Sequence, residues 1–178
     1  MKSISVMRRA HAVKRYHTEH TIGSQTIADH SYGVAMLTLH MTHGQASGNL
    51  LRAALYHDLA EQHTGDTPAP AKWASNDLAQ ALGSMEDDFE KKHGIHVELT
   101  DMEKIILKWA DSLELMFYCL EQRKLGNQYA EEPFYKVVAF LSKYHYFQPG
   151  ATVMQYLMEE MSTVRNNGEK KWQQTIGK

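Results

Sequence analysis

LLRAALYHDLAEQHTGD, residues 50–66, is the most informative segment of this sequence. Three apolar residues and one acid share a stripe at helical spacing within it: Leu51, Ala54, Leu55 and Asp58. The spacing predicts one amphipathic helix, which Asn49 caps and Gly65 ends. Asp58 is therefore expected on the core-facing side of its helix. A carboxylate there needs a cation or several hydrogen-bond donors to offset its lost hydration.

A histidine precedes this acid, so that His57 and Asp58 form an adjacent pair. Imidazole and carboxylate together suit Zn, Co, Mn or Fe far better than an all-oxygen magnesium site. The pair alone is a weak signal, because any helix can carry one. Elsewhere, His30 lies near the start of another predicted helix, and Asp111 lies in the apolar segment WADSLEL. An acid in such surroundings also needs a partner.

Helix signals dominate the rest of the chain, and strand alternation is nearly absent. Two capping boxes, Thr26 with Asp29 and Thr100 with Glu103, predict where two helices begin. The segment GDTPAPAKW holds two prolines and is expected to be a turn or loop. We predict an all-α fold, a single bundle of about six or more helices. Further helices are expected over residues 3–15, from 75 or 76 to 94, 132–147 and 152–165.

The bulk composition fits one globular domain, residues 1–178, with 43% hydrophobic and 22% charged residues. A net charge of −2 argues against a surface built for nucleic acid or anionic membranes. No segment has the length of a membrane span or the apolar core of a signal peptide. A single cysteine, Cys119, lies in an apolar run and is expected to be a buried, inert thiol. We expect a cytoplasmic protein without nucleic-acid or membrane partners.

Three segments carry a resemblance to a known family: KRYHTEHTIGSQTIADHS, YHDLAEQHTGDTPAPAKW and WADSLE. In them a His is followed after 26 residues by His-Asp and after a further 52 residues by an Asp, all on predicted helices. This order and spacing resemble the HD superfamily of metal-dependent phosphohydrolases. The chain is most similar there to bacterial 5′-deoxynucleotidases and to phage dATP triphosphohydrolases, over about residues 7–120.

The resemblance implies which residues bind the metal and which are catalytic. The implied metal ligands are His30, His57, Asp58 and Asp111. Glu61 lies one helical turn beyond His57, and the family assigns it a catalytic role in orienting or deprotonating water. Asp66 is also implied to be catalytic, with a turn-capping role after Gly65 as the alternative. The metal is expected to be Zn, Co, Mn or Fe, and a second ion such as Mg²⁺ can accompany a triphosphate.

Positive charges and one aromatic ring are implied to contact the substrate. Arg15 and Lys72 match positions that face phosphate in the family, with ordinary surface charge as the alternative. Tyr16 stands where the deoxynucleotidases have a Trp that packs near the sugar and disfavours a 2′-hydroxyl. Tyr16 is also aromatic, so a preference for deoxyribose is expected. Its ring is smaller than that of Trp, which weakens the steric basis for this preference.

Further substrate-binding positions are carried over on the same alignment. Thr18 and Pro70 correspond to base-lining positions of the phage enzymes. His17 and His20 can donate to phosphate or bind an additional metal. Lys108 lies one turn before Asp111 and is included as a substrate contact, although spacing alone favours a solvated lysine.

The expected activity is hydrolysis of a deoxynucleotide at the α-phosphorus. Cleavage of dATP to deoxyadenosine and triphosphate is the first choice, because Arg8, Arg9 and the basic 15–20 loop offer charge for extra phosphates. A 5′-deoxynucleotidase acting on monophosphates is the alternative, and a noncatalytic nucleotide-sensing module is a further one. A di-iron bundle is disfavoured, because the expected Glu-x-x-His pairs are missing. We also expect a homo-oligomer, in a bacterial or phage-infected cell.

Overall fold

The chain is helical in a computed structural model, which describes the backbone of residues 2–176. Side chains are described over the same range except at 2–3, 69–70, 73 and 167–176. Apart from helices, the described residues contain one isolated antiparallel bridge, between Lys14 and Thr26. The all-α prediction is confirmed. Two compact units divide the chain, Met1–Leu107 and Lys108–Lys178, and the expected single domain stays a prediction.

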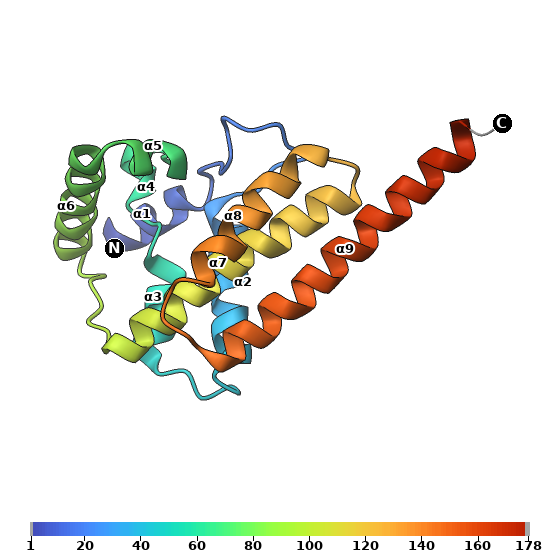
Figure 1. Cartoon of the computed structure of the whole chain (residues 1–178). Coiled ribbons are helices and arrows are strands. Elements are labelled where there is room, and N and C mark those ends of the chain that lie inside the picture. The colour runs from blue at the N-terminus through green and yellow to red at the C-terminus, as the bar shows by residue number, and fades with distance from the viewer. Residues whose placement is uncertain (1, 177–178) are drawn as a thin grey trace. The chain divides into compact units, whose positions relative to one another are not determined.

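Seven helices begin among the described residues of the first unit (Figure 1): α1 (Lys2–Ala10), α2 (Ile27–Met41), α3 (Gly48–Tyr56), α4 (Glu61–Thr64), α5 (Ala69–Ala74), α6 (Asn76–His93) and α7 (Asp101–Lys124). The predicted capping box at the start of α2 is present: the side chain of Thr26 accepts from the N–H of Asp29, and the Asp29 carboxylate accepts from the N–H of Thr26. Ser75 caps α6, and Gly94 ends it in the left-handed conformation, as expected.

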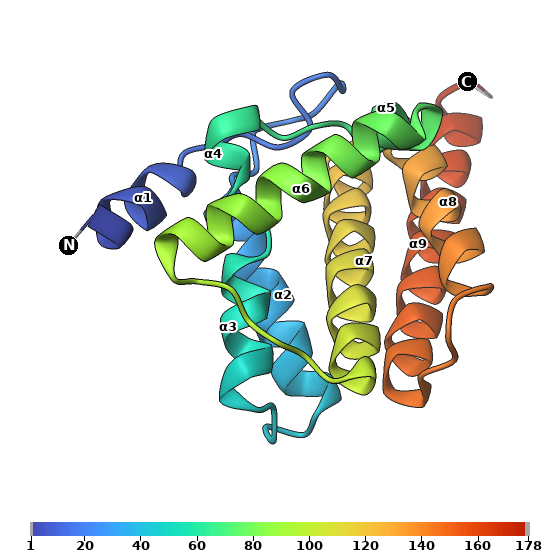
Figure 2. The ribbon, with the colours of Figure 1, turned by 90° about the vertical axis from the view of Figure 1, so that its left-hand side faces the viewer.

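Helices α2 and α3 form an antiparallel pair whose open end carries the site. They lie side by side in both views (Figures 1 and 2). Val34 of α2 and Leu50 and Ala54 of α3 are almost fully buried. Because the pair is antiparallel, the first turns of α2 and the end of α3 meet, which brings His30 near His57.

A second apolar cluster of this unit joins α1, the turn after α3, and α6. Its buried members are Val6, Ala10, Leu59, Ala60, Phe89 and Ile95, with Met7 and Tyr56 packed against them. This cluster draws Leu59 and Ala60, which follow His57, away from the axis of α3. The segment that follows His57 is consequently anchored on two sides, which holds the site residues of the turn in place.

The expected continuous helix through residues 50–64 is wrong. Helix α3 ends at Tyr56, residues 57–60 form a tight turn, and α4 starts at Glu61. In the turn, the N–H of Leu59 donates to the carbonyl of Tyr56 at 2.9 Å. Leu55, expected on the core-facing stripe, is 44% exposed, because the apolar cluster beside α1 recruits Leu59 instead. Asp58 therefore comes from a turn, and Ser47 rather than Asn49 caps α3.

Three other helix boundaries also differ from the predicted ones. Helix α1 ends at Ala10 rather than near residue 15, because residues 14 and 26 pair as extended chain. The proline segment is only partly loop, since Pro68 caps α5 and the next proline lies in its first turn, where a missing N–H costs nothing. The last helix starts at Gln148, so that Pro149 lies in its first turn, and it continues to Ile176, beyond the expected end at residue 165.

The second unit contains the rest of α7, the 3₁₀ turn Gln128–Ala130, α8 (Glu131–Leu141) and α9 (Gln148–Ile176). Arg123 near the end of α7 pairs with Glu131 at the start of α8, at 2.6 Å. Lys124 pairs with Glu160 of α9 at 2.9 Å. Hence α8 runs antiparallel to α7, and α9 runs parallel to it, as Figure 1 shows. Among the described residues, no helix combines the length and apolar character that a membrane crossing requires.

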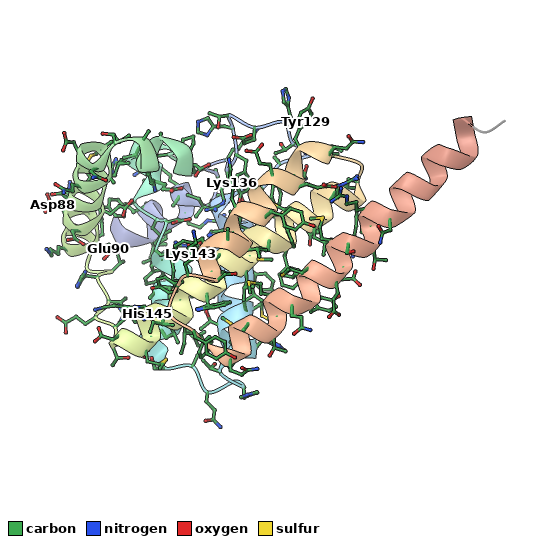
Figure 3. The ribbon with its side chains drawn as sticks, in the orientation of Figure 1. Asp88, Glu90, Tyr129, Lys136, Lys143 and His145 are labelled. Atoms are coloured by element: carbon green, nitrogen blue, oxygen red, sulfur yellow. The ribbon has the colours of Figure 1, made fainter. Side chains whose placement is uncertain are left out.

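The core of this unit includes the predicted buried thiol. Cys119 is 2% exposed, and burial raises its pKa to about 12, so that the thiol stays protonated and unreactive at neutral pH. Trp109 is also buried, and its indole N–H donates to the carbonyl of His145, in the connection between α8 and α9 labelled in Figure 3. Trp109 therefore ties α7 to the start of α9.

Gly150→Ala should destabilise the protein by about 1–3 kcal/mol, the usual cost of overpacking. A Cβ at Gly150 would lie 2.5 Å from Cε3 of the buried Trp109 ring, and the indole cannot retreat without breaking its hydrogen bond. Urea unfolding measures the change. Gly83→Ala on α6 is the matched control, because nothing lies within 4 Å of its added Cβ, and it should stabilise slightly. A Gly150→Ala protein as stable as wild type would contradict this packing.

Candidate active site and metal centre

Three of the four predicted metal ligands converge in the first unit. Nε2 of His30 lies 3.1 Å from Nε2 of His57 and 3.4 Å from Oδ2 of Asp58. Nε2 of His57 lies 3.4 Å from Oδ1 of Asp58. One ligand atom from each of the three residues thus falls within 4.8 Å of the others. The side chains come from α2 and from the turn after α3, and they surround one point.

The geometry of these side chains fits a divalent transition metal. Two nitrogens bound tetrahedrally at about 2.05 Å lie about 3.3 Å apart, which is close to the His30–His57 separation. Nδ1 of His57 lies 3.0 Å from the carbonyl oxygen of Ala54, so this nitrogen carries the proton and Nε2 presents a lone pair. His30 is fully buried, and Asp58 supplies the negative charge that a buried dication requires.

The fourth predicted ligand, Asp111, belongs to the second unit. It lies on α7, and its Oδ2 accepts from the Nζ of Lys108 at 2.9 Å. The same Lys108 ammonium lies 5.8 Å from the centre of the Phe140 ring. Lys108 is therefore an ion-pair partner of Asp111 in this structure. A metal-binding role for Asp111 and a substrate contact for Lys108 stay predictions.

Arg15 reaches the ligand cluster directly. Its Nη1 donates to Oδ2 of Asp58 at 2.6 Å, and both side chains are largely buried. The Nη2 atom lies 3.4 Å from the hydroxyl of Tyr16, and the guanidinium carbon lies 5.2 Å from the centre of the Tyr16 ring. A planar guanidinium at this place suits the recognition of phosphate oxygens beside the metal. The alternative of an ordinary surface charge is wrong for Arg15.

Glu61 is a buried acid at the start of α4. Its side chain is 6% exposed, and its Oε2 has no hydrogen-bond partner among the described residues. Burial raises its pKa from 4.5 to about 8, and the charges of Asp58 and Asp66 act in the same direction. Arg15 and Lys72 lower the pKa, which places both cations near this carboxyl. A carboxyl group with such a pKa can hold or release a proton near neutral pH.

The metal-free protein should lose stability as the pH rises from about 4.5 to about 8. Over this range the folded state keeps a proton on Glu61 that the unfolded chain releases. Each unit by which the pH rises therefore lowers the free energy of unfolding. The expected loss is on the order of 3 kcal/mol. Urea unfolding in the presence of a chelator at pH 5 and pH 8 measures it. Glu61→Gln should flatten the profile, and an unchanged slope in this variant would assign the effect to other groups.

Asp66 bonds to a distant segment rather than to its own turn. Its Oδ2 accepts from the backbone N–H of Tyr16 at 2.8 Å and lies 4.0 Å from Nδ1 of His17. Tyr16 has a φ of 56°, a left-handed conformation that costs about 1–2 kcal/mol for a residue with a side chain. Oδ2 of Asp66 therefore holds the distant Tyr16 backbone and does not cap the turn after Gly65.

The remaining predicted contacts lie on the 15–25 segment and on α5. Thr18 and His20 are exposed on the 15–25 segment, which closes on itself through the bridge between residues 14 and 26. Lys72 is half-buried on α5, a helix where a loop was expected. Pro70 lies in the first turn of α5, but its side chain is outside the described residues. Roles of these residues toward base or phosphate stay predictions.

One acid near the site was missed. Glu86 of α6 is partly buried, and burial raises its pKa, while the positive charge of Lys72 lowers it. It also interacts electrostatically with Asp58 and His57, so it lies within electrostatic range of the ligand cluster. The sequence did contain a signal, because Glu86 lies four residues after Leu82 and three before Phe89, two buried residues of one helical face.

A helical unit that gathers a His and a His-Asp pair around one point defines an HD-type phosphohydrolase. A family model for YfbR-like 5′-deoxynucleotidases matches residues 2–98, more than half of the chain. The chain therefore belongs to the YfbR-like 5′-deoxynucleotidase family. The match ends before Asp111, so it bears on the ligands of the first unit only.

Individual relatives agree with this family. The chain is 29% identical to the 5′-deoxynucleotidase YfbR of Salmonella typhi, over 67% of this chain and 71% of the relative. Its fold resembles an HD-domain phosphohydrolase of Listeria innocua, with a TM-score of 0.72, 18% identity, and coverage of 90% and 88% of the two chains. It also resembles the cyanophage S-2L HD phosphohydrolase DatZ, solved with dA and one catalytic Zn²⁺, with a TM-score of 0.67, 20% identity, and coverage of 91% and 96%. The predicted HD-type phosphohydrolase enzyme is confirmed.

Proposed function

We propose that this protein hydrolyses 5′-deoxynucleotides at the α-phosphorus with a divalent transition metal. The convergence of His30, His57 and Asp58 beside the Arg15 guanidinium carries this proposal, because it combines a metal centre with a phosphate-binding cation. When bound, the metal would polarise a phosphate oxygen and acidify a water molecule. Asp111 would complete the ligand set. The relatives' activity on deoxynucleotides and the Zn²⁺ of DatZ support the substrate class and the kind of metal.

The protein's own side chains supply the remaining chemistry. In its ionised form, which a bound metal cation would favour, Glu61 accepts the proton of the attacking water at Oε2, an atom that no described residue hydrogen-bonds. Arg15 donates to the phosphate, and Lys72 contributes a second positive charge against the negative charge that develops there. Burial of His30 and Glu61 excludes bulk water, which strengthens these electrostatic effects. A bond forms between phosphorus and the water oxygen, the bond between phosphorus and the 5′ oxygen breaks, and the nucleoside leaves once its 5′ oxygen has taken up a proton.

The same bond breaks in a monophosphate and in a triphosphate, so the ligand set does not distinguish them. We place the 5′-deoxynucleotidase reaction first, because the family and the relatives match by sequence, whereas the likeness to DatZ is one of fold. The dATP triphosphohydrolase expected from the sequence is the second candidate. The exposed Arg8 and Arg9, with His17 and the neighbouring loop, favour it as additional phosphate contacts. A homo-oligomer and a cytoplasmic location remain expectations.

The test compares dAMP and dATP at equal concentration with Zn²⁺, Co²⁺ or Mn²⁺, with AMP and ATP as ribose controls. Inorganic phosphate from dAMP, exceeding any triphosphate from dATP at least about tenfold in kcat/KM, would support the monophosphatase. The reverse ratio would establish the triphosphohydrolase. Absence of turnover on all four nucleotides with metal bound would overturn the proposed function and favour a nucleotide-sensing module.

A further inference from the structure

The conformation of Tyr16 is unusual for a residue with a large side chain. Its φ of 56° lies in the left-handed region, which among the described non-glycine residues only His43 shares. Such a conformation persists only where the surrounding structure holds it, and it is commonly found where a side chain must point into a site. The contacts that hold Tyr16 therefore bear on the function of the loop.

Both backbone groups of Tyr16 are bonded. Its carbonyl accepts from the N–H of Glu19 at 3.0 Å, which is a bond within the loop. Its N–H donates to Oδ2 of Asp66 at 2.8 Å, a residue 50 positions along the chain. The neck of the loop is closed separately, by the N–H of Arg15 donating to the carbonyl of Gln25 at 2.9 Å. Asp66 is thus an external anchor for the strained residue of this loop.

Tyr16 in turn leads to the ligand cluster. The Tyr16 ring stands against the Arg15 guanidinium, at 5.2 Å from ring centre to guanidinium carbon. Arg15 then donates to Asp58 at 2.6 Å. A path of direct contacts therefore runs from Asp66 through the Tyr16 backbone and ring to Arg15 and the metal-binding carboxylate.

We propose that Asp66 is a positioning residue, which holds Tyr16 left-handed so that its ring and the Arg15 guanidinium face the sugar and phosphate of the substrate. This role deepens the proposed function and rests on it. It replaces the direct catalytic role expected from the family resemblance. Asp66 then acts on substrate selection through Tyr16, and its contribution is to binding and to the preference for deoxyribose.

The two roles need different properties of residue 66. A hydrogen-bond acceptor for the Tyr16 N–H does not have to ionise, so an asparagine oxygen can replace the carboxylate oxygen. A group that transfers a proton cannot be replaced in this way. Asp66→Asn and Asp66→Ala therefore separate positioning from proton transfer.

The experiment measures kcat and KM of the metal-loaded enzyme for dAMP and AMP. Asp66→Asn should keep KM for dAMP within about threefold of wild type, because the acceptor is retained. Asp66→Ala should raise this KM about tenfold to a hundredfold and lower the ratio of dAMP to AMP efficiency, with a smaller change in kcat. An equal, large loss of kcat in both variants would overturn the proposal and establish a proton-transfer role.

A double-mutant cycle with Tyr16→Gly checks that the effect passes through Tyr16. Glycine adopts a φ of 56° without strain and has no ring to orient. Asp66→Ala should then add less than about twofold to the KM of Tyr16→Gly, a clear departure from additivity. A full additional loss in the glycine background would show that Asp66 acts elsewhere, and would overturn the proposal.

Amide hydrogen exchange at Tyr16 tests the anchor independently of turnover. The Tyr16 N–H should exchange slowly in wild type and in Asp66→Asn, and at least about tenfold faster in Asp66→Ala. This readout remains valid even if no nucleotide is hydrolysed, so failure of the proposed function and failure of the anchor are distinguishable. Equal exchange in all three proteins would overturn the positioning role.

Discussion

Glu61→Gln should lower kcat by about 10²–10⁴-fold while the protein remains folded and metal-bound. The glutamine keeps the size of the side chain but cannot accept a proton at neutral pH. The wild-type carboxyl is 6% exposed, has an Oε2 without a partner among the described residues, and has a pKa raised to about 8. Steady-state kinetics with dAMP and with dATP, at matched metal occupancy, measure the loss.

Two controls sharpen this result. Glu90→Gln makes the same chemical change at an acid of α6 that pairs with His96 and is not a member of the His30, His57 and Asp58 cluster, and it should leave kcat unchanged. Metal content by mass spectrometry should be the same in wild type and Glu61→Gln. If Glu61→Gln kept more than about a third of the wild-type kcat, another group would have to accept the proton.

His57→Ala should reduce activity at least about 10³-fold and abolish stoichiometric metal binding. Its Nε2 is one of two imidazole nitrogens that lie 3.1 Å apart, and the Ala54 carbonyl fixes the tautomer in which Nε2 carries the lone pair. Dialysis of the wild type against a chelator should produce the same loss, and Zn²⁺, Co²⁺ or Mn²⁺ should restore activity in the wild type alone. Calorimetric titration with Zn²⁺ measures the binding directly.

The matched control for this variant is His40→Ala, an exposed histidine of α2, which should retain both metal and activity. Asp111→Ala extends the test to the second unit, where loss of metal affinity would establish the fourth ligand. His57→Ala with normal metal content and normal turnover would refute the metal centre proposed for this chain.

Short-range signals predicted much of the helix content correctly. The capping boxes at Thr26 and Thr100 act between residues three positions apart, so the local sequence contains all the information that they need. Gly94 ends α6 for an equally local reason, since it adopts the left-handed conformation that glycine tolerates. The order and spacing of His, His-Asp and Asp also suggested the candidate ligands, and the structure brings three of them together: His30, His57 and Asp58.

Tertiary packing overrode the local pattern at the site itself. The periodicity of residues 50–64 suits one helix. Burial of Leu59 and Ala60 against α1 stabilises the protein more than a continuous helix would, so the helix stops and Asp58 projects from a turn. A hydrophobic pattern records which residues are apolar and not which neighbour will bury them. The exposure of Leu55 follows from the same competition.

By itself, then, the sequence determined the all-α class and the helix starts marked by capping boxes, and it suggested the candidate metal ligands. Only the tertiary structure decided the geometry and charge of the site. The contacts of Arg15 with Asp58 and of Tyr16 with Asp66 join residues 43 and 50 positions apart, and Glu61 has a raised pKa because folding removes it from water. These are long-range consequences of packing, and no local pattern along the chain encodes them.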